Sequence, residues 1–598
     1  MFFLFLPLIA ALALFCDTKK KLPAFAVAGT ALVAAFLRVA AMTFKNRFSG
    51  RTFSVSLGHY ATFGGQDYHW RFSFTRSEIV LIAFMIFVAL LNVLFARFYV
   101  VKEKRTRYFA SVCALSFLMI LTVGSVNLFQ FFAGWEGTVL ISYLVMLSFH
   151  EKQSIRRAAN RFFVANMAGD MALLAALFMF ETKTGSFVVP PFTNGAEVAF
   201  SPLQSFCFAT LMLIGVCTKM TLFVSPVLVS EIAELSVPAL AYIMPCVSGG
   251  AAFYVLYNAW PFFASSREAK ILYLLVGSVS AVTGIGGALI KRNIKSVLAY
   301  LLTGWFGIVV AVLAVGGRAI ALRSFVALML PAAGLIYSVG LIVWALRGEE
   351  ETDKMGGLNV AVPYLFWIMA ILSLCCVGFP GIGTFGVWQN LYAALYLKGG
   401  LLTALVFTVL SFGTAWAFAR LLYVVFFAPC KIRPEVMGAM LKPSIWMIAP
   451  PAILMTVSLF QEFVFRNSIL DDLTTVETTG MLALSLAGCS GICIGFGYYA
   501  ARKRRAPPGV KKAVTEVVRF LSAGAFYERA VMRPVTVFAR IVWSFFSSDP
   551  TAERIPVAIR RTAERWRVIQ SGKLSVFIMP ALIGLFVLLT VVAVFVKG

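Results

Sequence analysis

Runs of about 20 apolar residues recur along the whole chain, separated by short polar segments. A helix of this length spans the hydrocarbon core of a bilayer, whereas the strands of a membrane barrel are shorter and alternate polar with apolar positions. A helix also satisfies its own backbone hydrogen bonds in lipid. About sixteen spans are predicted, near residues 1–17, 22–42, 78–101, 108–126, 128–149, 159–181, 203–229, 236–262, 269–290, 294–316, 321–346, 361–390, 399–428, 443–465, 479–501 and 573–597.

The composition supports the same fold class. Only 13% of the 598 residues are charged and 60% are hydrophobic, while soluble domains carry about a quarter charged residues. The sequence therefore predicts an all-α polytopic membrane protein.

The net charge of +26 is concentrated near the C-terminus, where residues 502–573 contain 16 Lys or Arg and five acids. Basic residues beside membrane spans contact anionic headgroups, and no nucleic-acid-binding motif accompanies them. We expect this segment to contact an anionic phospholipid such as cardiolipin, or a neighbouring subunit, and we expect no nucleic-acid partner.

The basic segment also predicts an amphipathic helix. Ala506–Gly509 breaks the preceding span, and apolar residues then recur at helical spacing from Lys511 to about Ser547, with arginines between them. Such a helix lies along a membrane surface or against neighbouring subunits. The alternative is a disordered basic linker, which the apolar content of the segment disfavours.

Three ionisable residues lie inside or at the start of apolar spans: Glu136, Asp170 and Lys219. A charge in hydrocarbon is costly, so such residues usually face the interior of a helix bundle and mark ion pathways or proton relays. The sequence therefore indicates ion movement as a function.

Two spans are predicted to be broken. Ser225-Pro226 follows Lys219, and Glu231, Glu234 and Pro238 come before the next apolar run. A second interruption, Gly378–Gly383, lies inside the run at 361–390. Discontinuous helices in two halves of a chain are typical of inverted-repeat transporters. Ordinary proline kinks are the alternative.

No metal or cofactor site is predicted. The ten cysteines are mostly scattered within spans, and none forms a metal-ligand cluster with the three histidines. The glycines of Gly284–Gly287 lie in an apolar run, where small residues allow close helix packing. Any redox chemistry is therefore expected in other proteins.

Several motifs, taken in order, resemble one family. Gly134–Gly137 (GWEG) matches its glutamate-bearing helix, Thr218-Lys219 matches the start of a TKSAQ motif, and Asn293–Tyr300 is similar to DIKRVLAY. Lys354–Leu358 matches KMGGL residue for residue. The chain resembles the antiporter-like membrane subunits of respiratory NADH:ubiquinone oxidoreductase (complex I). The basic C-terminal segment and a last span that opens at Gln570–Leu574 resemble the subunit-5 type.

The resemblance implies a role for each candidate residue. Glu136 and Lys219 would be the acid–base pair of a first half-channel, with Asp170 as a modulating carboxylate. Lys295 would be the central lysine of the proton path, and Glu231 and Glu234 would lie along it. The alternatives are a loop anchor for Lys295, a headgroup contact for Asp170 and a structural hydrogen bond for Glu136.

The second half departs from the family pattern. The family's histidine falls at Met244, a lysine position falls at Pro331 or Ala332, and a lysine and an acid fall near Gln389 and Asn390. Neutral polar side chains support a water wire but hold no proton at physiological pH. We therefore expect a rerouted or impaired exit path.

The resemblance also divides the chain into regions. These are N-terminal transmembrane helices (1–107), two antiporter-like halves related as inverted repeats (108–262 and 263–428), C-terminal transmembrane helices (429–501), a basic amphipathic lateral helix (502–572) and a final transmembrane anchor (573–598).

The function implied is proton translocation in complex I, driven by NADH oxidation and ubiquinone reduction in other subunits. FMN and iron–sulfur clusters are expected in those subunits and no cofactor in this chain. The partners would be other membrane-arm subunits, in the mitochondrial inner membrane or a bacterial plasma membrane. A subunit of a multisubunit cation/proton antiporter or membrane-bound hydrogenase, and a non-pumping scaffold, are the alternatives.

Overall fold

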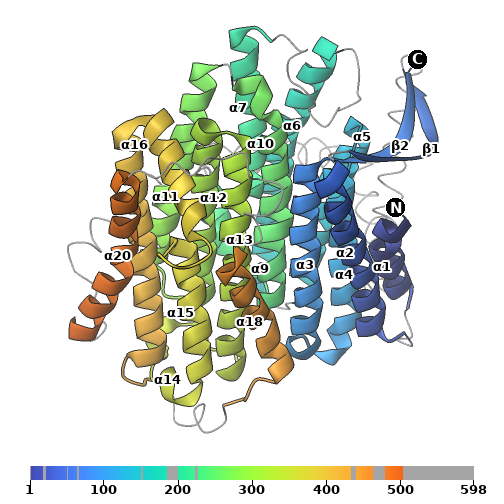
Figure 1. Cartoon of the computed structure of the whole chain (residues 1–598). Coiled ribbons are helices and arrows are strands. Elements are labelled where there is room, and N and C mark those ends of the chain that lie inside the picture. The colour runs from blue at the N-terminus through green and yellow to red at the C-terminus, as the bar shows by residue number, and fades with distance from the viewer. Residues whose placement is uncertain are drawn as a thin grey trace, which may run out of the picture.

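The computed structural model describes residues 2–17, 22–49, 52–63, 66–149, 153–184, 200–222, 226–264, 266–432, 440–461 and 479–502. Long helices run side by side in one bundle, and a β-hairpin projects at the edge near the N-terminus (Figure 1). The first helices, α1 to α5, lie at one side of the bundle and α16 and α20 at the other (Figure 1). The late helix α18 packs beside α3 and α13.

The N-terminal part contains the hairpin and the first helices: η1 (Phe2–Phe5), α1 (Leu6–Cys16), α2 (Ala24–Ser49), β1 (Phe53–Phe63), β2 (Gln66–Phe74), α3 (Arg76–Tyr99) and α4 (Lys102–Val123). The central part contains α5 (Leu128–Phe149), α6 (Gln153–Thr184), α7 (Pro202–Lys219), α8 (Pro226–Ile232), α9 (Val237–Tyr242), the π-helix η2 (Ile243–Ser248), α10 (Gly249–Phe263), α11 (Arg267–Ile290), α12 (Ile294–Gly316) and α13 (Arg318–Ala345). The last part contains η3 (Thr352–Lys354), α14 (Leu358–Ala361), α15 (Pro363–Val377), α16 (Phe385–Leu422), η4 (Tyr423–Phe427), α18 (Ile445–Leu459) and α20 (Thr479–Arg502).

The predicted membrane class is confirmed. Twelve helices within the described ranges are long and apolar enough to cross a membrane, and α1, α15 and α18 are shorter apolar helices. Every predicted span up to residue 501 coincides with helical residues. The span at 573–597 and the amphipathic helix at 511–547 lie outside the described residues. The number of spans and the division into regions therefore stay predictions.

Local sequence signals set where several helices begin. Ser201 and Gln204 form a capping box at the start of α7, and Asn293 accepts hydrogen bonds from the backbone of Lys295 and Ser296 at the start of α12. Such caps satisfy backbone N–H groups that the first turn leaves unpaired.

The β-hairpin is the element that the sequence reading missed. β1 and β2 pair antiparallel, and Phe72 and Phe74 of β2 are buried against the bundle. Phe72 packs edge-on against Phe5, with ring centroids 5.3 Å apart. The alternation of Phe72 and Phe74 around Ser73 was a strand signal, but it is short and lies between two strong helical spans.

Both predicted breaks are present. α7 ends at Lys219 and the chain turns before α8, while α15 ends at Val377 and turns through Gly378, whose φ of 69° is left-handed. In addition, Gly400 (φ 82°) divides α16 into two helical parts. The backbone of the first break is buried at residues 220–222 and that of the second at Gly378, whereas Gly381 and Gly400 are exposed.

A buried hydrogen-bond network ties distant helices together. Tyr108 donates to Asn92 Oδ1 at 2.7 Å, and Asn92 donates to Tyr337 OH at 3.0 Å and to the Pro238 carbonyl at 2.5 Å. These residues come from α4, α3, α13 and α9. The network holds α9, which contains Pro238 and follows the first break.

Glycines let α11 and α12 approach closely, as the sequence predicted for Gly284. A Cβ added to Gly284 would lie only 2.6 Å from the Cα of Gly304 and would collide with that backbone. A Cβ added to Gly277 would lie 2.6 Å from the carbonyl oxygen of Gly307. The two helices therefore pack backbone to backbone, as small residues permit in membranes.

We expect Gly284→Ala to destabilise the protein by about 1–3 kcal/mol, because the added methyl group forces two backbones apart. The thermal midpoint of the purified protein in detergent measures the loss. Gly29→Ala is the matched control, since no atom lies within 4 Å of a Cβ built on Gly29. Equal midpoints for the two variants would contradict the argument.

Candidate functional site

Three neighbouring helices bring Glu136, Asp170 and Lys219 together. Glu136 lies on α5, Asp170 on α6, and Lys219 is the last residue of α7. α6 packs against both α5 and α7. Gly169 makes the approach of α6 to α7 possible, since a side chain there would collide with Thr218. The sequence prediction of one cluster around these three residues agrees with this geometry.

Trp135 joins the three charged residues, and the sequence reading missed it. Its indole Nε1 donates to Asp170 Oδ1 at 2.5 Å, while Lys219 Nζ donates to its backbone carbonyl at 2.8 Å. The ammonium also lies 3.4 Å from the centroid of the indole ring. The one signal was its place beside Glu136 in the Gly-Trp-Glu-Gly motif.

The cluster is largely buried and contains two acids but only one base. Asp170 is 1% exposed and Lys219 is 2% exposed, while Glu136 is half-buried. The two carboxyl groups repel each other and each is attracted by the single ammonium. Among the described residues, no ion pair of 4.0 Å or less joins Lys219 to either acid. Two acids that compete for one base in a low dielectric change their protonation together.

Lys295 lies at the end of a span instead of in the middle of the bundle. It occupies the first turn of α12, and its Nζ is 2.7 Å from Glu350 Oε1 and 3.3 Å from the Leu235 carbonyl. Glu350 also accepts a hydrogen bond from Asn293 at 2.8 Å. This geometry matches the loop-anchor alternative, and the role of Lys295 as a central lysine stays a prediction. Glu350 was missed because its partner lies 55 residues away.

The remaining candidates of the first half lie apart from the cluster. Glu231 on α8 is buried and pairs with Arg161 of α6 at 3.2 Å. Glu234 follows in the turn before α9 and is exposed. No structural observation tests their predicted place on a proton path.

The second half has neutral side chains at the predicted positions. Gln389 is half-buried and Asn390 is buried in the first turns of α16, just after the second break. Pro331 and Ala332 are buried in α13, and Met244 is buried in the π-helix η2.

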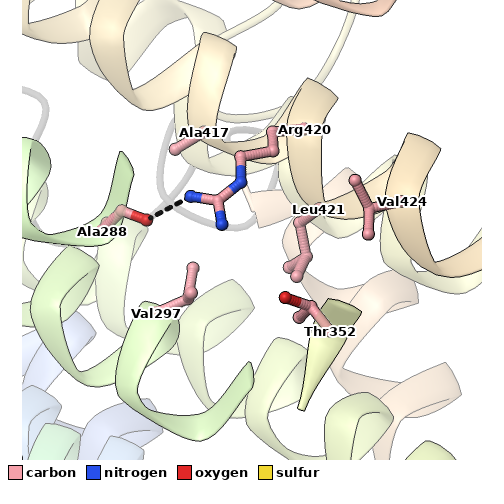
Figure 2. A pocket seen from close by; sticks show the side chains of 7 residues that line it. All are labelled: Ala288, Val297, Thr352, Ala417, Arg420, Leu421 and Val424. Atoms are coloured by element: carbon pink, nitrogen blue, oxygen red, sulfur yellow. Dashed lines mark hydrogen bonds between the residues drawn. The ribbon is translucent and has the colours of Figure 1, made fainter. Parts of the chain in front are cut away.

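A half-buried arginine closes the end of α11. Arg420 of α16 donates to the carbonyls of Ala288 and Leu289, in the last turn of α11, and of Lys291, which follows the helix. Figure 2 shows the guanidinium pointing to Ala288, above a small pocket whose opposite wall includes Val297 and Thr352. A cation at this helix end satisfies carbonyls that lack a partner within the helix. This arrangement fixes α16 against the turn between α11 and α12.

The described residues contain no group of three or more His, Cys, Asp and Glu side chains arranged to hold a metal ion.

Comparison with known proteins gives a family match for residues 125–414, to a model described as NADH:quinone oxidoreductase/Mrp antiporter, transmembrane. NADH-quinone oxidoreductase subunit L of Mycobacterium tuberculosis (strain CDC 1551 / Oshkosh) is 24% identical over 509 residues, which cover 80% of this chain and 79% of that protein. NADH-ubiquinone oxidoreductase chain 5 of Marchantia polymorpha is 23% identical over 421 residues, covering 68% of this chain and 63% of that protein.

Two solved structures have a similar fold. A chain of the membrane-bound sulfane sulfur reductase, an archaeal respiratory membrane complex, has a TM-score of 0.73 at 18% identity and covers 94% of this chain and 98% of its own. A chain of the Mrp complex from Dietzia sp. DQ12-45-1b has a TM-score of 0.67 at 16% identity, with 86% and 98% covered. The protein is thus a multi-pass membrane protein, and its residues 125–414 match the NADH:quinone oxidoreductase/Mrp antiporter transmembrane model.

Proposed function

We propose that this protein is a membrane-arm subunit of an NADH:quinone oxidoreductase and contributes to proton translocation across the membrane. The observation that carries the proposal is the buried cluster of Glu136, Asp170 and Lys219 around Trp135. NADH oxidation and quinone reduction occur in other subunits, which hold FMN and iron–sulfur clusters. This chain supplies acid–base groups and no redox catalysis.

The cluster exchanges protons because its charges do not balance. One ammonium stabilises only one of the two carboxylates well. The other carboxyl group therefore holds a proton, which the three groups share. Movement of the ammonium toward one acid releases a proton from that acid and favours uptake at the other. Trp135 holds Asp170 and Lys219 close to each other, because its indole donates to the acid and its carbonyl accepts from the base.

The first break gives Lys219 its freedom to move. The ammonium belongs to the last turn of α7, where the helix dipole favours a cation. Two residues later Thr221 has a φ of 53°, a left-handed conformation that is strained for a β-branched residue. A strained turn beside a buried charge suits a segment that shifts between two arrangements.

The partners of this subunit are the neighbouring antiporter-like subunits of the membrane arm, with the basic segment at 502–572 as the contact and an anionic phospholipid such as cardiolipin beside it. The membrane is the mitochondrial inner membrane or a bacterial plasma membrane. The neutral second half favours one alternative, a scaffold that holds the arm together without pumping.

Glu136→Gln tests the proposal in the assembled complex, reconstituted in liposomes. Loss of a positioned acid–base group slows a proton transfer by about 100-fold or more, so we expect fewer protons translocated per NADH oxidised. Glu103→Gln, in the exposed first turn of α4, is the control and should leave the ratio unchanged. An unchanged ratio with Glu136→Gln, in a complex of normal composition, would favour the scaffold.

Trp135→Phe separates the two contacts of the indole. The variant keeps an aromatic ring near Lys219 but removes the hydrogen bond to Asp170, a bond to a charged group worth about 1.5–3 kcal/mol. We expect a proton-to-NADH ratio between those of the wild type and Glu136→Gln, with assembly preserved. A ratio equal to that of the wild type would show that the Trp135–Asp170 bond has no part in translocation.

A further inference from the structure

A row of hydroxyl groups lies where α12 packs against the first break and α8, and all of them except that of the half-buried Ser230 are buried. Thr221 Oγ1 and Thr303 Oγ1 are 2.9 Å apart, and Ser230 Oγ and Tyr300 OH are 3.3 Å apart. Each pair joins a residue of the discontinuous segment to a residue of α12. The two pairs therefore form successive polar contacts along one helix interface.

The row leads from the cluster toward Lys295. Thr221 comes two residues after Lys219, and Thr303 and Tyr300 are about 4.5 Å apart along the axis of α12. Lys295 lies about 7.5 Å further along the same axis. Lys291 extends the contacts at this end, with its Nζ 3.5 Å from Ser230 Oγ.

The burial of these groups calls for an explanation. Thr221 is 1% exposed, Thr303 3% and Tyr300 7%. Polar groups in an apolar bundle are costly and usually have a functional use. A hydroxyl group accepts a proton on its oxygen and releases its own, so hydroxyls paired in a row suit proton transfer, with water bridging the longer steps.

The row ends where the bundle opens. Lys295 is 5% exposed, whereas the side chain of its partner Glu350 is 31% exposed. Glu350 therefore links the buried Lys295 to the surface of the bundle. The pair therefore terminates the row on one side of the bundle.

Buried hydroxyl groups also lie on α16 and α20, where Tyr392 interacts with the hydroxyl groups of Ser411 and Thr408. Among the described residues, no ion pair joins these hydroxyl-bearing residues of α16 to an acid. The hydroxyls at the α8–α12 interface are paired and end at an acid, which favours that interface as the route.

We propose that the proton leaves this subunit along the α8–α12 interface, from Lys219 past Thr221, Thr303 and Tyr300 to Glu350, and not along α16 and α20. The proposal rests on the proposed function of the Glu136 cluster. Lys219 gives up a proton, each hydroxyl takes one and releases its own, and Glu350 takes the last and passes it to solvent. Lys295 positions Glu350 and is not itself a carrier.

Paired variants in the reconstituted complex test the route. Thr303→Val with Tyr300→Phe removes two hydroxyl groups of the row and preserves side-chain shape. Tyr392→Phe with Ser411→Ala removes two hydroxyls of the second half. We expect the first pair to lower the protons translocated per NADH about as far as Glu136→Gln does, and the second pair to leave the ratio unchanged.

A rescue variant separates loss of the hydroxyl group from loss of packing, and several outcomes would contradict the route. Thr303→Ser with native Tyr300 keeps both hydroxyls and should retain the wild-type ratio, which separates loss of the hydroxyl from loss of packing. A lowered ratio with the second pair alone, or equal losses with both pairs, overturns the route. If Glu136→Gln lowers the ratio and the first pair does not, the route fails while the proposed function stands. If Glu136→Gln has no effect, the proposed function itself fails.

Discussion

An ammonium inside an apolar bundle needs substitutes for water, and the arrangement around Lys219 follows from that need. The backbone carbonyl of Trp135 accepts its hydrogen bond, the indole ring faces it, and the C-terminal end of α7 favours its charge. None of these partners is an anion in direct contact. The lysine is therefore stabilised without being locked to one carboxylate, and Glu136 and Asp170 stay free to compete for it.

The close packing of helices makes this arrangement possible. Gly169 lets α6 approach Thr218, the residue beside the lysine, and Gly284 lets α11 pack against the backbone of α12. α12 is therefore held firmly on one side, while its other side contacts the broken segment through Thr303 and Tyr300. Because α12 is held firmly, a displacement of the broken segment changes the hydrogen bonds between that segment and α12 but leaves the packing of the other helices intact.

The sequence reveals the charged residues of the site better than their partners. Glu136 and Lys219 stand out because a charge in an apolar run is costly, whereas Trp135 looks like any packing aromatic until its indole is seen to bind Asp170. The end position of Lys295 was readable, since Asn293 is a good helix cap. Its pairing with Glu350 was not, because it depends on how the chain returns after α13. The helices were predicted well because their apolar runs are long. The β-hairpin was not predicted because its alternating pattern is short and lies between two helical spans.

The ends of the two broken helices show how the second break is stabilised without a charged residue. A helix C-terminus leaves carbonyls without partners, and these favour a cation or need a donor. At the end of α7 the cation is Lys219. At the end of α15 the carbonyls of Val377 and Gly378 accept from the thiol of Cys489, at 3.3 Å each. A neutral donor on α20 thus satisfies the second break, so the discontinuous fold persists there with the neutral side chains of Gln389 and Asn390 just after it, whereas the first break ends at a charged residue.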